Sequence, residues 1–420
     1  MKDNQAKYPQ LRFKGFTDPW EQRKLTDISE KVTEKNSDNE FSETLTNSAE
    51  YGIISQRDFF DKDISNEKNL NTYYVVRDGD FVYNPRISNF APVGPIKRNT
   101  LGRTGVMSPL YYIFRAHNVD GMYLEKYFSS TKWHRFMELN GDTGARADRF
   151  AIKDKDFVQM PIPLPNLEEQ SKIARFLENV DNLIAANQRK LDLLKEQKKG
   201  YLQKMFPKNG SKFPQLRFAG FADAWEQRKF EYLLDENDGI RRGPFGSALK
   251  KECFVSQSDY VVYEQQNAIY NKYETRYNIT KDKFEELKKF ELKPEDFIMS
   301  GAGTIGRISR VPHGIDKGVF NQALIRFRID NRITDSEYFL QFIRADFMQK
   351  KLTSTNPGSA ITNLVPMSEV KKWGILVPQI NEQSKIGIFF KQLDKTITLH
   401  QRKLEKLQEL KKGYLQKMFC

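Results

Sequence analysis

The sequence predicts a mixed α+β protein of the broad α/β class, with two globular domains separated by two long antiparallel helices that form a coiled coil. Three observations support this. The chain has 420 residues, which exceeds one ordinary hydrophobic core. It repeats itself, and each repeat ends in a long heptad pattern. We expect a cyclic arrangement with pseudo-two-fold symmetry.

Two blocks of sequence occur twice. Residues 9–25 return as 214–230 with 13 of 17 positions identical, and residues 164–206 return as 377–419 with 24 of 43 identical. The stretches between them are unlike. A duplicated structural domain would explain the repeats, but a duplicated frame that presents two different recognition surfaces also explains why only the middles diverged.

The repeated blocks also predict the domain boundaries. The same eight residues, Lys-Gly-Tyr-Leu-Gln-Lys-Met-Phe, precede both the internal junction and the C-terminal residue. Joining the two termini would recreate that junction, so we expect the chain ends to lie close together. The boundaries that follow are a first domain at 1–163 with its shared segment at 9–25, a helix at 164–206, a linker at 207–213, a second domain at 214–376 and a helix at 377–420.

Apolar residues recur at spacings of four and three in both long helices, which is typical of a coiled-coil seam. The seam positions are Ile173, Leu177, Val180, Ile184, Asn187, Leu191 and Leu194 in the first helix, and Ile386, Phe390, Leu393, Ile397, His400, Leu404 and Leu407 in the second. Each helix could instead bury its seam in its own domain, but about 36 residues would extend roughly 54 Å. The short linker favours antiparallel pairing. Asn187 and His400 occupy equivalent positions, where we expect a polar pair that sets the register rather than a catalytic group.

Charge and composition narrow the classes of function. Lys and Arg number 68 against 55 Asp and Glu, for a net charge of +13, which favours an anionic partner such as nucleic acid. Two cysteines exclude a disulfide framework, and four scattered histidines argue against a metal centre. No apolar run approaches the roughly 20 residues of a membrane span. We expect a soluble, cytoplasmic protein.

The middle stretches carry local patterns of both strands and helices. Short apolar alternations predict strands at 80–83, 110–114, 296–299 and 323–327. Each pair of strands is followed by a helical pattern, at 123–139 and 338–352. Both domains are therefore predicted to be mixed α/β.

Basic and aromatic residues are interleaved in windows that lack acids. Residues 81–115 contain no Asp or Glu, and the glycine-rich residues 239–251 carry four cations and no acid. Because such windows lack carboxylates, they would not repel a phosphate backbone. The alternative is a strand face with an excess of positive charge that binds no ligand. Glycine-containing polar loops follow at 141–149 and 354–363. The candidate DNA-binding residues are Arg86, Lys97, Arg98, Arg103, Arg146, Arg149, Arg241, Arg242, Ser247, Lys250, Lys251, Thr304, Arg307, Arg310, Ser359, Thr362 and Asn363.

Catalytic motifs are not found. Residues 301–306 match GxGxxG, but a strand-like segment follows where a dinucleotide site needs a helix. Asn84-Pro-Arg-Ile lacks the second proline and the aromatic residue of the amino-methyltransferase loop. No phosphate loop of the form GxxxxGK[ST] is present. A self-contained nuclease or methyltransferase therefore lacks its motif here, and we assign no catalytic and no metal-binding residue.

Several segments together resemble the DNA specificity subunit of type I restriction-modification enzymes, over essentially the whole chain. They are Leu-Pro-Asn-Leu-Glu-Glu-Gln-Ser-Lys-Ile-Ala at 164–174, its partner at 377–386, Trp-Glu-Gln-Arg-Lys at 20–24 and again at 225–229, Gly-Pro-Phe-Gly-Ser at 243–247, and Ser-Gly-Ala-Gly-Thr-Ile-Gly at 300–306. The first domain departs from the last two patterns.

The resemblance implies that each variable domain is a target-recognition domain that reads one half of a bipartite double-stranded DNA target. The helices would set the gap between the halves. Two methyltransferase subunits and the restriction and translocase subunits would be partners in bacterial defence. S-adenosylmethionine, ATP and Mg²⁺ would belong to those partners, so this chain would be a non-catalytic subunit without a cofactor. A stand-alone DNA-binding regulatory protein with two modules is the alternative.

Overall fold

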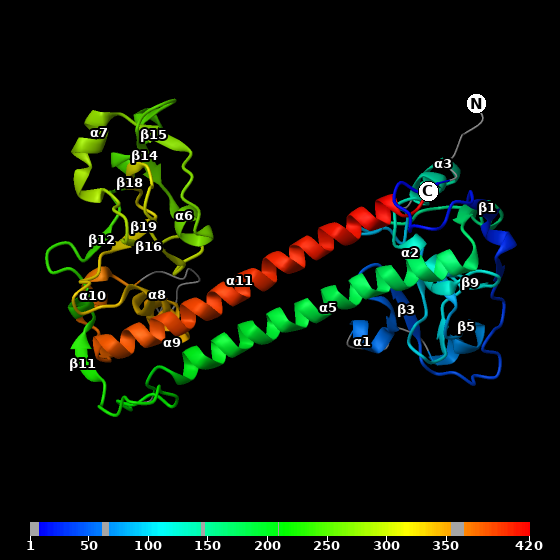
Figure 1. Ribbon diagram of the computed structural model, residues 1–420, viewed down its shortest axis with the longest axis horizontal. Coiled ribbons are helices and arrows are strands. Elements are labelled where there is room, and N and C mark those ends of the chain that lie inside the picture. Colours follow the sequence, from blue (N-terminus) through cyan, green and yellow to red (C-terminus); the bar gives the residue numbers. More distant parts are fainter. Residues whose placement is uncertain (1–7, 61–66, 144–147, 209, 354–364) are drawn as a thin grey trace. The chain divides into compact units, whose positions relative to one another are not determined.

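The computed structural model (Figure 1) divides by its contacts into two compact units. Unit 1 comprises residues 1–188 and 402–420, and unit 2 comprises residues 189–401. The end of the last helix thus belongs with the start of the chain. Both units mix helices and strands, as the sequence predicts. The structure describes residues 8–60, 67–143, 148–208, 210–353 and 365–420.

Unit 1 is built around a four-stranded antiparallel sheet in the order β2-β9-β6-β7. Successive side chains of a strand point to opposite faces of the sheet. Phe81 of β6 and Phe114 of β9 point into the same core, where their ring centroids are 5.3 Å apart and the rings stack. Pairs β1-β10, β3-β4 and β5-β8 complete the described strands. Its strands are β1 (Glu21–Lys24), β2 (Ser29–Lys31), β3 (Leu45–Ser48), β4 (Gly52–Ser55), β5 (Tyr74–Val76), β6 (Phe81–Tyr83), β7 (Ile96–Arg98), β8 (Gly105–Met107), β9 (Tyr112–Ala116) and β10 (Pro161–Leu164). Its short helices are α1 (Gln56–Phe60), α2 (Gly121–Phe128), α3 (His134–Asn140) and α4 (Asp154–Phe157).

Unit 2 repeats this sheet and adds a second one. The order β12-β19-β16-β17 matches the first unit strand for strand, while β13-β15-β14-β18 includes one parallel pair, β14 with β18. Its strands are β11 (Glu226–Lys229), β12 (Ile240–Arg242), β13 (Phe254–Val255), β14 (Tyr260–Tyr263), β15 (Tyr277–Ile279), β16 (Phe297–Ser300), β17 (Ile308–Arg310), β18 (Lys317–Phe320), β19 (Leu324–Phe327) and β20 (Gly374–Val377). Its short helices are α6 (Gln265–Tyr270), α7 (Lys281–Glu286), α8 (Ser336–Arg344), α9 (Asp346–Leu352) and α10 (Met367–Lys372).

The two predicted helical patterns at 123–139 and 338–352 are each two helices rather than one. Between α2 and α3, the Ser130 hydroxyl donates to the Tyr127 carbonyl and accepts from the Lys132 amide, which ends the first helix. Between α8 and α9, Ala345 is extended, with ψ of 138°. A local backbone break of this kind leaves the apolar period almost unchanged, so the pattern alone does not reveal it.

The long helices α5 (Leu167–Lys204) and α11 (Ile380–Lys417) each contain 38 residues. In unit 1, Phe176 meets Tyr414 with ring centroids 4.9 Å apart, and in unit 2 Tyr201 meets Phe389 at 5.1 Å. Early residues of one helix thus meet late residues of the other within each unit, which confirms the predicted antiparallel pairing. None of the described helices is both long and apolar enough to span a bilayer.

The seam positions are buried or half-buried along both helices. At the helix starts they belong to the domain cores: Ile173 and Leu177 lie in the core of unit 1, and Ile386 and Phe390 in that of unit 2. The seam is therefore buried in both of the expected ways, against the domain of its own unit and against the other long helix. Asn187 is buried and donates from Nδ2 to the Leu183 carbonyl of its own helix at 2.8 Å. The role of Asn187 and His400 in setting the register stays a prediction.

The repeated N-terminal segments make the same contacts in both units. Arg12 donates two hydrogen bonds of 2.8 Å to the buried Glu169, and the Leu11 amide donates to the Lys417 carbonyl. In unit 2, Arg217 binds Glu382 in the same way, and the Leu216 amide donates to the Lys204 carbonyl. The start of the chain is therefore fastened to the end of α11 as the internal junction is fastened to the end of α5, which confirms the cyclic repeat.

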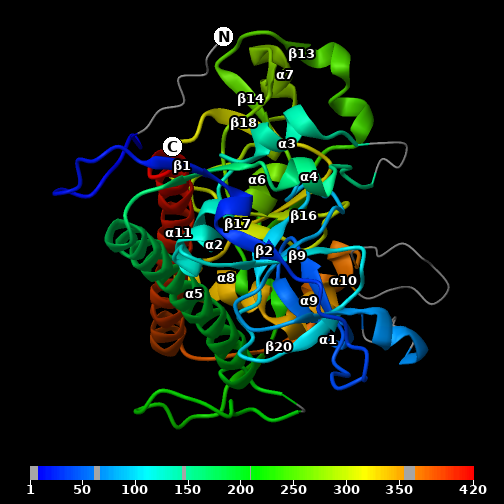
Figure 2. The same ribbon diagram turned by 90° about the vertical axis from the view of Figure 1, so that its right-hand side faces the viewer.

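A short helix that follows the four-stranded sheet in sequence also lies against a long helix in each unit. In unit 1, α2 packs against α5 (Figures 1 and 2), and Lys126 of α2 reaches Glu178 and Asp181 of α5 at 2.7 and 2.9 Å. In unit 2, Gln341 of α8 reaches Asp394 of α11 at 3.0 Å. Each long helix thereby fixes the orientation of the sheet that carries the candidate loops.

Candidate nucleic-acid interface

Two hairpin loops occupy equivalent places in the two four-stranded sheets. Phe81 lies opposite Arg98 in the β6–β7 pair, and Phe297 lies opposite Arg310 in the β16–β17 pair. The loop at 84–95 in unit 1 therefore corresponds to the loop at 301–307 in unit 2. The sequence does not show this, because the loops differ in length and only the second is rich in glycine.

The loop of unit 2 is tightly fixed. Gly303 and Gly306 have φ values of 61° and 81°, which favour glycine, and a Cβ atom at Gly306 would overlap the side chain of Gln349 on α9. Gln349 Nε2 donates to the Gly306 carbonyl at 3.1 Å. Strand β17 follows, as the sequence predicts, so the dinucleotide-site context is absent from this loop. The fixed backbone leaves the side chains of Thr304 and Arg307 exposed.

A cationic cleft of about 610 Å³ lies beside this loop within unit 2. Arg307 lines it together with Lys195 and Lys199 of α5, and these three cations make no ion pair with any described residue. Lys198, also in the lining, pairs with Asp394 at 2.6 Å; burial lowers its pKa and Asp394 partly opposes that shift. Three unpaired cations around a glycine-rich loop form a site that can hold phosphate groups.

In unit 1 the equivalent loop is held to a second loop. Arg86 and Arg149 form an isolated β-bridge, and the Phe150 amide donates to the Pro85 carbonyl at 2.7 Å. Two cations predicted from separate segments are thus brought together. Neither side chain makes an ion pair with a described residue, and Arg86 is exposed.

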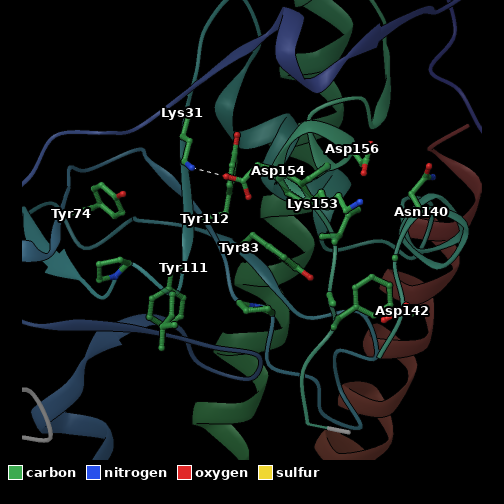
Figure 3. Close-up of a pocket in the computed structure, with 18 residues that line it drawn as sticks. Lys31, Tyr74, Tyr83, Tyr111, Tyr112, Asn140, Asp142, Lys153, Asp154 and Asp156 are labelled. Atoms are coloured by element: carbon green, nitrogen blue, oxygen red, sulfur yellow. Dashed lines mark hydrogen bonds and ion pairs between the residues drawn. The ribbon is translucent and has the colours of Figure 1, made fainter. Parts of the chain in front are cut away.

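An aromatic cleft of about 490 Å³ adjoins this pair of loops (Figure 3). Its lining includes Tyr74, Tyr83, Tyr111 and Tyr112, and the carboxylates of Asp142, Asp154 and Asp156. Lys31 Nζ lies 2.6 Å from Asp154 and 5.1 Å from the Tyr112 ring centroid. Burial, with a contribution from Asp154, raises the pKa of Tyr112 to about 12, so its hydroxyl stays protonated. Aromatic side chains can stack on the face of a planar ring such as a nucleobase, and the hydrogen-bonding groups beside them can bind its polar edge.

A further cationic loop follows β12 in unit 2. Arg242, Ser247, Lys250 and Lys251 are exposed, and the three cations make no ion pair among the described residues. The loop begins where the Gly243 amide donates to the Leu324 carbonyl at 2.9 Å. Two separate segments of the domain in unit 2, 242–251 and 304–307, therefore expose cations that make no ion pair with a described residue.

Comparison with known proteins decides the family. The family described as type I restriction modification DNA specificity domain matches residues 17–196 and 245–409, which is most of the chain. The chain belongs to this specificity family. Among the described residues of this family member, no three His, Cys, Asp or Glu side chains gather as a metal ion would require.

Individual relatives agree with the family match. The chain is 23% identical over 327 residues to the type I restriction enzyme MjaVIII specificity subunit of Methanocaldococcus jannaschii, covering 74% of this chain and 73% of that protein. It matches the S subunit of a type I restriction-modification system from M. genitalium with a TM-score of 0.56 and 12% identity over 98% and 99% of the two chains. The HsdS subunit from Thermoanaerobacter tengcongensis gives a TM-score of 0.50 and 14% identity over 97% and 98%. These structural matches show the shared fold.

Other predicted cations of this specificity-family chain are neutralised by acids. The ion pairs are Arg98 with Glu125 at 3.7 Å, Arg103 with Glu43 at 2.8 Å, Arg241 with Asp238 at 2.8 Å, and Arg310 with Glu337 at 2.8 Å. Lys97 is half-buried; burial lowers its pKa, and Lys411 lowers it further. The windows that lack acids in sequence therefore meet acids from elsewhere in the fold. This leaves a smaller set of cations able to meet phosphate.

Four candidates cannot be placed: Arg146, Ser359, Thr362 and Asn363 lie outside the described residues. Two site residues were missed by sequence reasoning, Lys195 and Lys199. They lie outside the acid-free windows, and their spacing of four residues, which places both on one face of α5, is the only local signal that could have identified them.

Proposed function

We propose that this chain reads the two halves of a bipartite DNA target, one half with each unit, and supplies no catalytic residue. The observation that carries this proposal is the pair of equivalent hairpin loops. Each is fixed to its own sheet and exposes an arginine that makes no ion pair within the described part of the chain, Arg86 in unit 1 and Arg307 in unit 2. Cations held in fixed positions orient a domain on the phosphate backbone, so that other side chains can read bases.

The difference between the two units supports recognition of two different half-sites. Unit 1 offers an aromatic cleft with carboxylates, whereas unit 2 offers a lysine- and arginine-lined cleft beside a glycine loop. Different donors and acceptors select different base edges. We propose that the repeated segments and the long helices α5 and α11 bind two methyltransferase subunits and restriction or translocase subunits. Those partners would bind S-adenosylmethionine, ATP and Mg²⁺. The stand-alone regulatory protein is disfavoured by the family match.

Methylation mapping tests the proposal. The chain is co-expressed with a type I methyltransferase subunit, and modified adenines are mapped across the genome. We expect one split motif. Exchanging residues 231–376 for the corresponding segment of another family member should change one half of that motif and leave the other. A change in both halves, or an unsplit motif, would contradict reading by separate units.

A further inference from the structure

The loop after β12 exposes a large apolar side chain among positive charges. Phe245 has 89% of its surface exposed. Four residues that are also exposed surround it in sequence: Arg242, Ser247, Lys250 and Lys251. An isolated exposed phenyl ring is unfavourable in water, and three unpaired cations raise that local cost by mutual repulsion. A partner that covers this loop must therefore be both anionic and able to contact an apolar ring.

The loop is held rigidly rather than hanging free. A Cβ atom at Gly243 would overlap the Asn321 carbonyl, and one at Gly246 would lie 2.8 Å from Gln322 Oε1. Behind the loop, the rings of Phe254 and Tyr277 stack 4.4 Å apart. The Ala248 amide donates to the Phe245 carbonyl at 2.8 Å. The backbone that carries the Phe245 ring is thus held in place, which reduces the entropy lost when a ligand binds the loop.

Double-stranded DNA combines the two required properties. Its phosphates match Arg242, Lys250 and Lys251, and its base faces are apolar and planar. A phenylalanine on a cationic loop can enter between neighbouring base pairs and partly unstack them, which kinks the duplex. An apolar protein surface would meet the ring but would leave the three cations without partners.

We propose that Phe245 is a wedge that enters the base stack of the half-site bound by unit 2 and bends the DNA there. The wedge rests on the proposed function, because unit 2 must contact DNA for it to act. Pyrimidine–purine steps unstack most easily, so the wedge selects such a step by deformability rather than by hydrogen bonds. It adds to Arg307 and Thr304, which act from the other segment.

The experiment uses the full chain and a duplex that carries the mapped target, with 2-aminopurine placed in turn at each position of the half-site of unit 2. Wild-type protein should raise the fluorescence at one step and shorten the distance between dyes on the duplex ends. Phe245→Ala should abolish both signals and weaken binding about 10-fold or more. Phe245→Leu, which keeps an aliphatic wedge, should retain part of each. Leu399→Ala is the matched control, since it removes another exposed apolar side chain of unit 2, on α11.

The outcomes separate the wedge from its premise. Unchanged fluorescence and bending in Phe245→Ala would overturn the wedge even where affinity falls. Retained DNA affinity with lost binding of a methyltransferase subunit would show that the ring docks protein, which also overturns it. Failure of the wild-type chain to bind any duplex would instead remove the proposed function itself.

Discussion

The ammonium group of Lys198 lies 2.6 Å from Asp394 Oδ1, and the equivalent pair with the two long helices exchanged is Lys411 and Asp181 at 2.5 Å. Each pair joins α5 to α11 inside one unit. Each aspartate also accepts from its own recognition domain, from Lys126 in unit 1 and from Gln341 in unit 2. In each unit a single carboxylate therefore links both long helices and a short helix of the domain, α2 or α8, which explains how each domain is held in a fixed position on the long helices.

Replacing Lys126 should test how much this link stabilises unit 1. Its side chain is 6% exposed and its ammonium contacts both Glu178 and Asp181. Lys126→Met leaves Glu178 without this cation and leaves Asp181 with Lys411 alone, so we expect a loss of about 2 kcal/mol in the free energy of unfolding by urea. Lys126→Gln reproduces the arrangement of unit 2 and should cost less. The exposed Lys190→Met on α5 serves as the control, and equal losses in Met and Gln variants would contradict the argument.

The paired Arg12 and Glu169 provide a second stability test, because Glu169 is fully buried and Arg12 is its bidentate partner. Arg12→Leu leaves a buried carboxylate without its cation and should lower the free energy of unfolding by about 3 kcal/mol. The loss is detected as unfolding at a lower urea concentration. The double variant Arg12→Leu with Glu169→Leu should recover much of that loss, since no charge is then left unpaired. Arg217 and Glu382 should behave alike in unit 2. A double variant no better than Arg12→Leu would argue against ion pairing as the cause.

Asp238 predicts a pH dependence of stability. Burial raises the pKa of this carboxyl, but hydrogen bonds from Arg326 and Arg241 outweigh that effect and lower the pKa to about 2 from 3.8. A lowered folded-state pKa contributes stability above pH about 4 that is lost as the pH falls toward 2. Asp238→Asn should therefore be less stable than wild type at pH 7, with the difference shrinking below pH 4. Thermal unfolding at a series of pH values measures it, and a constant difference would refute this origin.

Local patterns explain which features the sequence could predict. The antiparallel helices and the strands β6 and β16 follow from periodicities carried by neighbouring residues. The neutralisation of predicted cations could not be predicted in this way. The partner of Arg103 is Glu43, 60 residues away, and the partner of Arg98 is Glu125, outside the acid-free window 81–115. An acid-free stretch of sequence is therefore not an acid-free surface.

Local sequence patterns also could not predict which candidate residues lie together in one site. Arg86 and Arg149 were predicted from separate windows, and only the backbone bridge between them shows that they form one surface. Lys195 and Lys199 belong to a cleft wall that the frame helix and the recognition domain make together. Sites assembled from segments of different origin leave no local signal in a single sequence.

Arg242 and Arg241 are adjacent in sequence but should differ in their effect on DNA binding. Arg242 is exposed and forms no ion pair with any residue that the structure describes, whereas Arg241 donates to Asp238 at 2.8 Å. Arg242→Ala should reduce the magnitude of the slope of log affinity against log salt by about 1. Arg241→Ala should change that slope less and should instead lower the stability of unit 2. Binding titrations over a range of salt concentrations measure both slopes, and an unchanged slope for Arg242→Ala would exclude a phosphate contact there.

The two long helices predict how the spacing of the target can be altered. The boundary between the units falls within both helices, after Gln188 in α5 and after Gln401 in α11. Inserting seven residues at both places preserves the heptad seam and lengthens each helix by about 10 Å. At about 3.4 Å per base pair, we expect the gap in the methylated motif to widen by about three base pairs. Methylation maps measure the gap directly.

A two-residue insertion at the same two places is the control, because it turns the rest of each helix by about 200° and so places the following part of the apolar seam on the opposite face. That variant should lose stability and methylation together, without a new motif. An unaltered gap in the seven-residue variant, with methylation retained, would show that something other than the length of α5 and α11 sets the spacing between the half-sites.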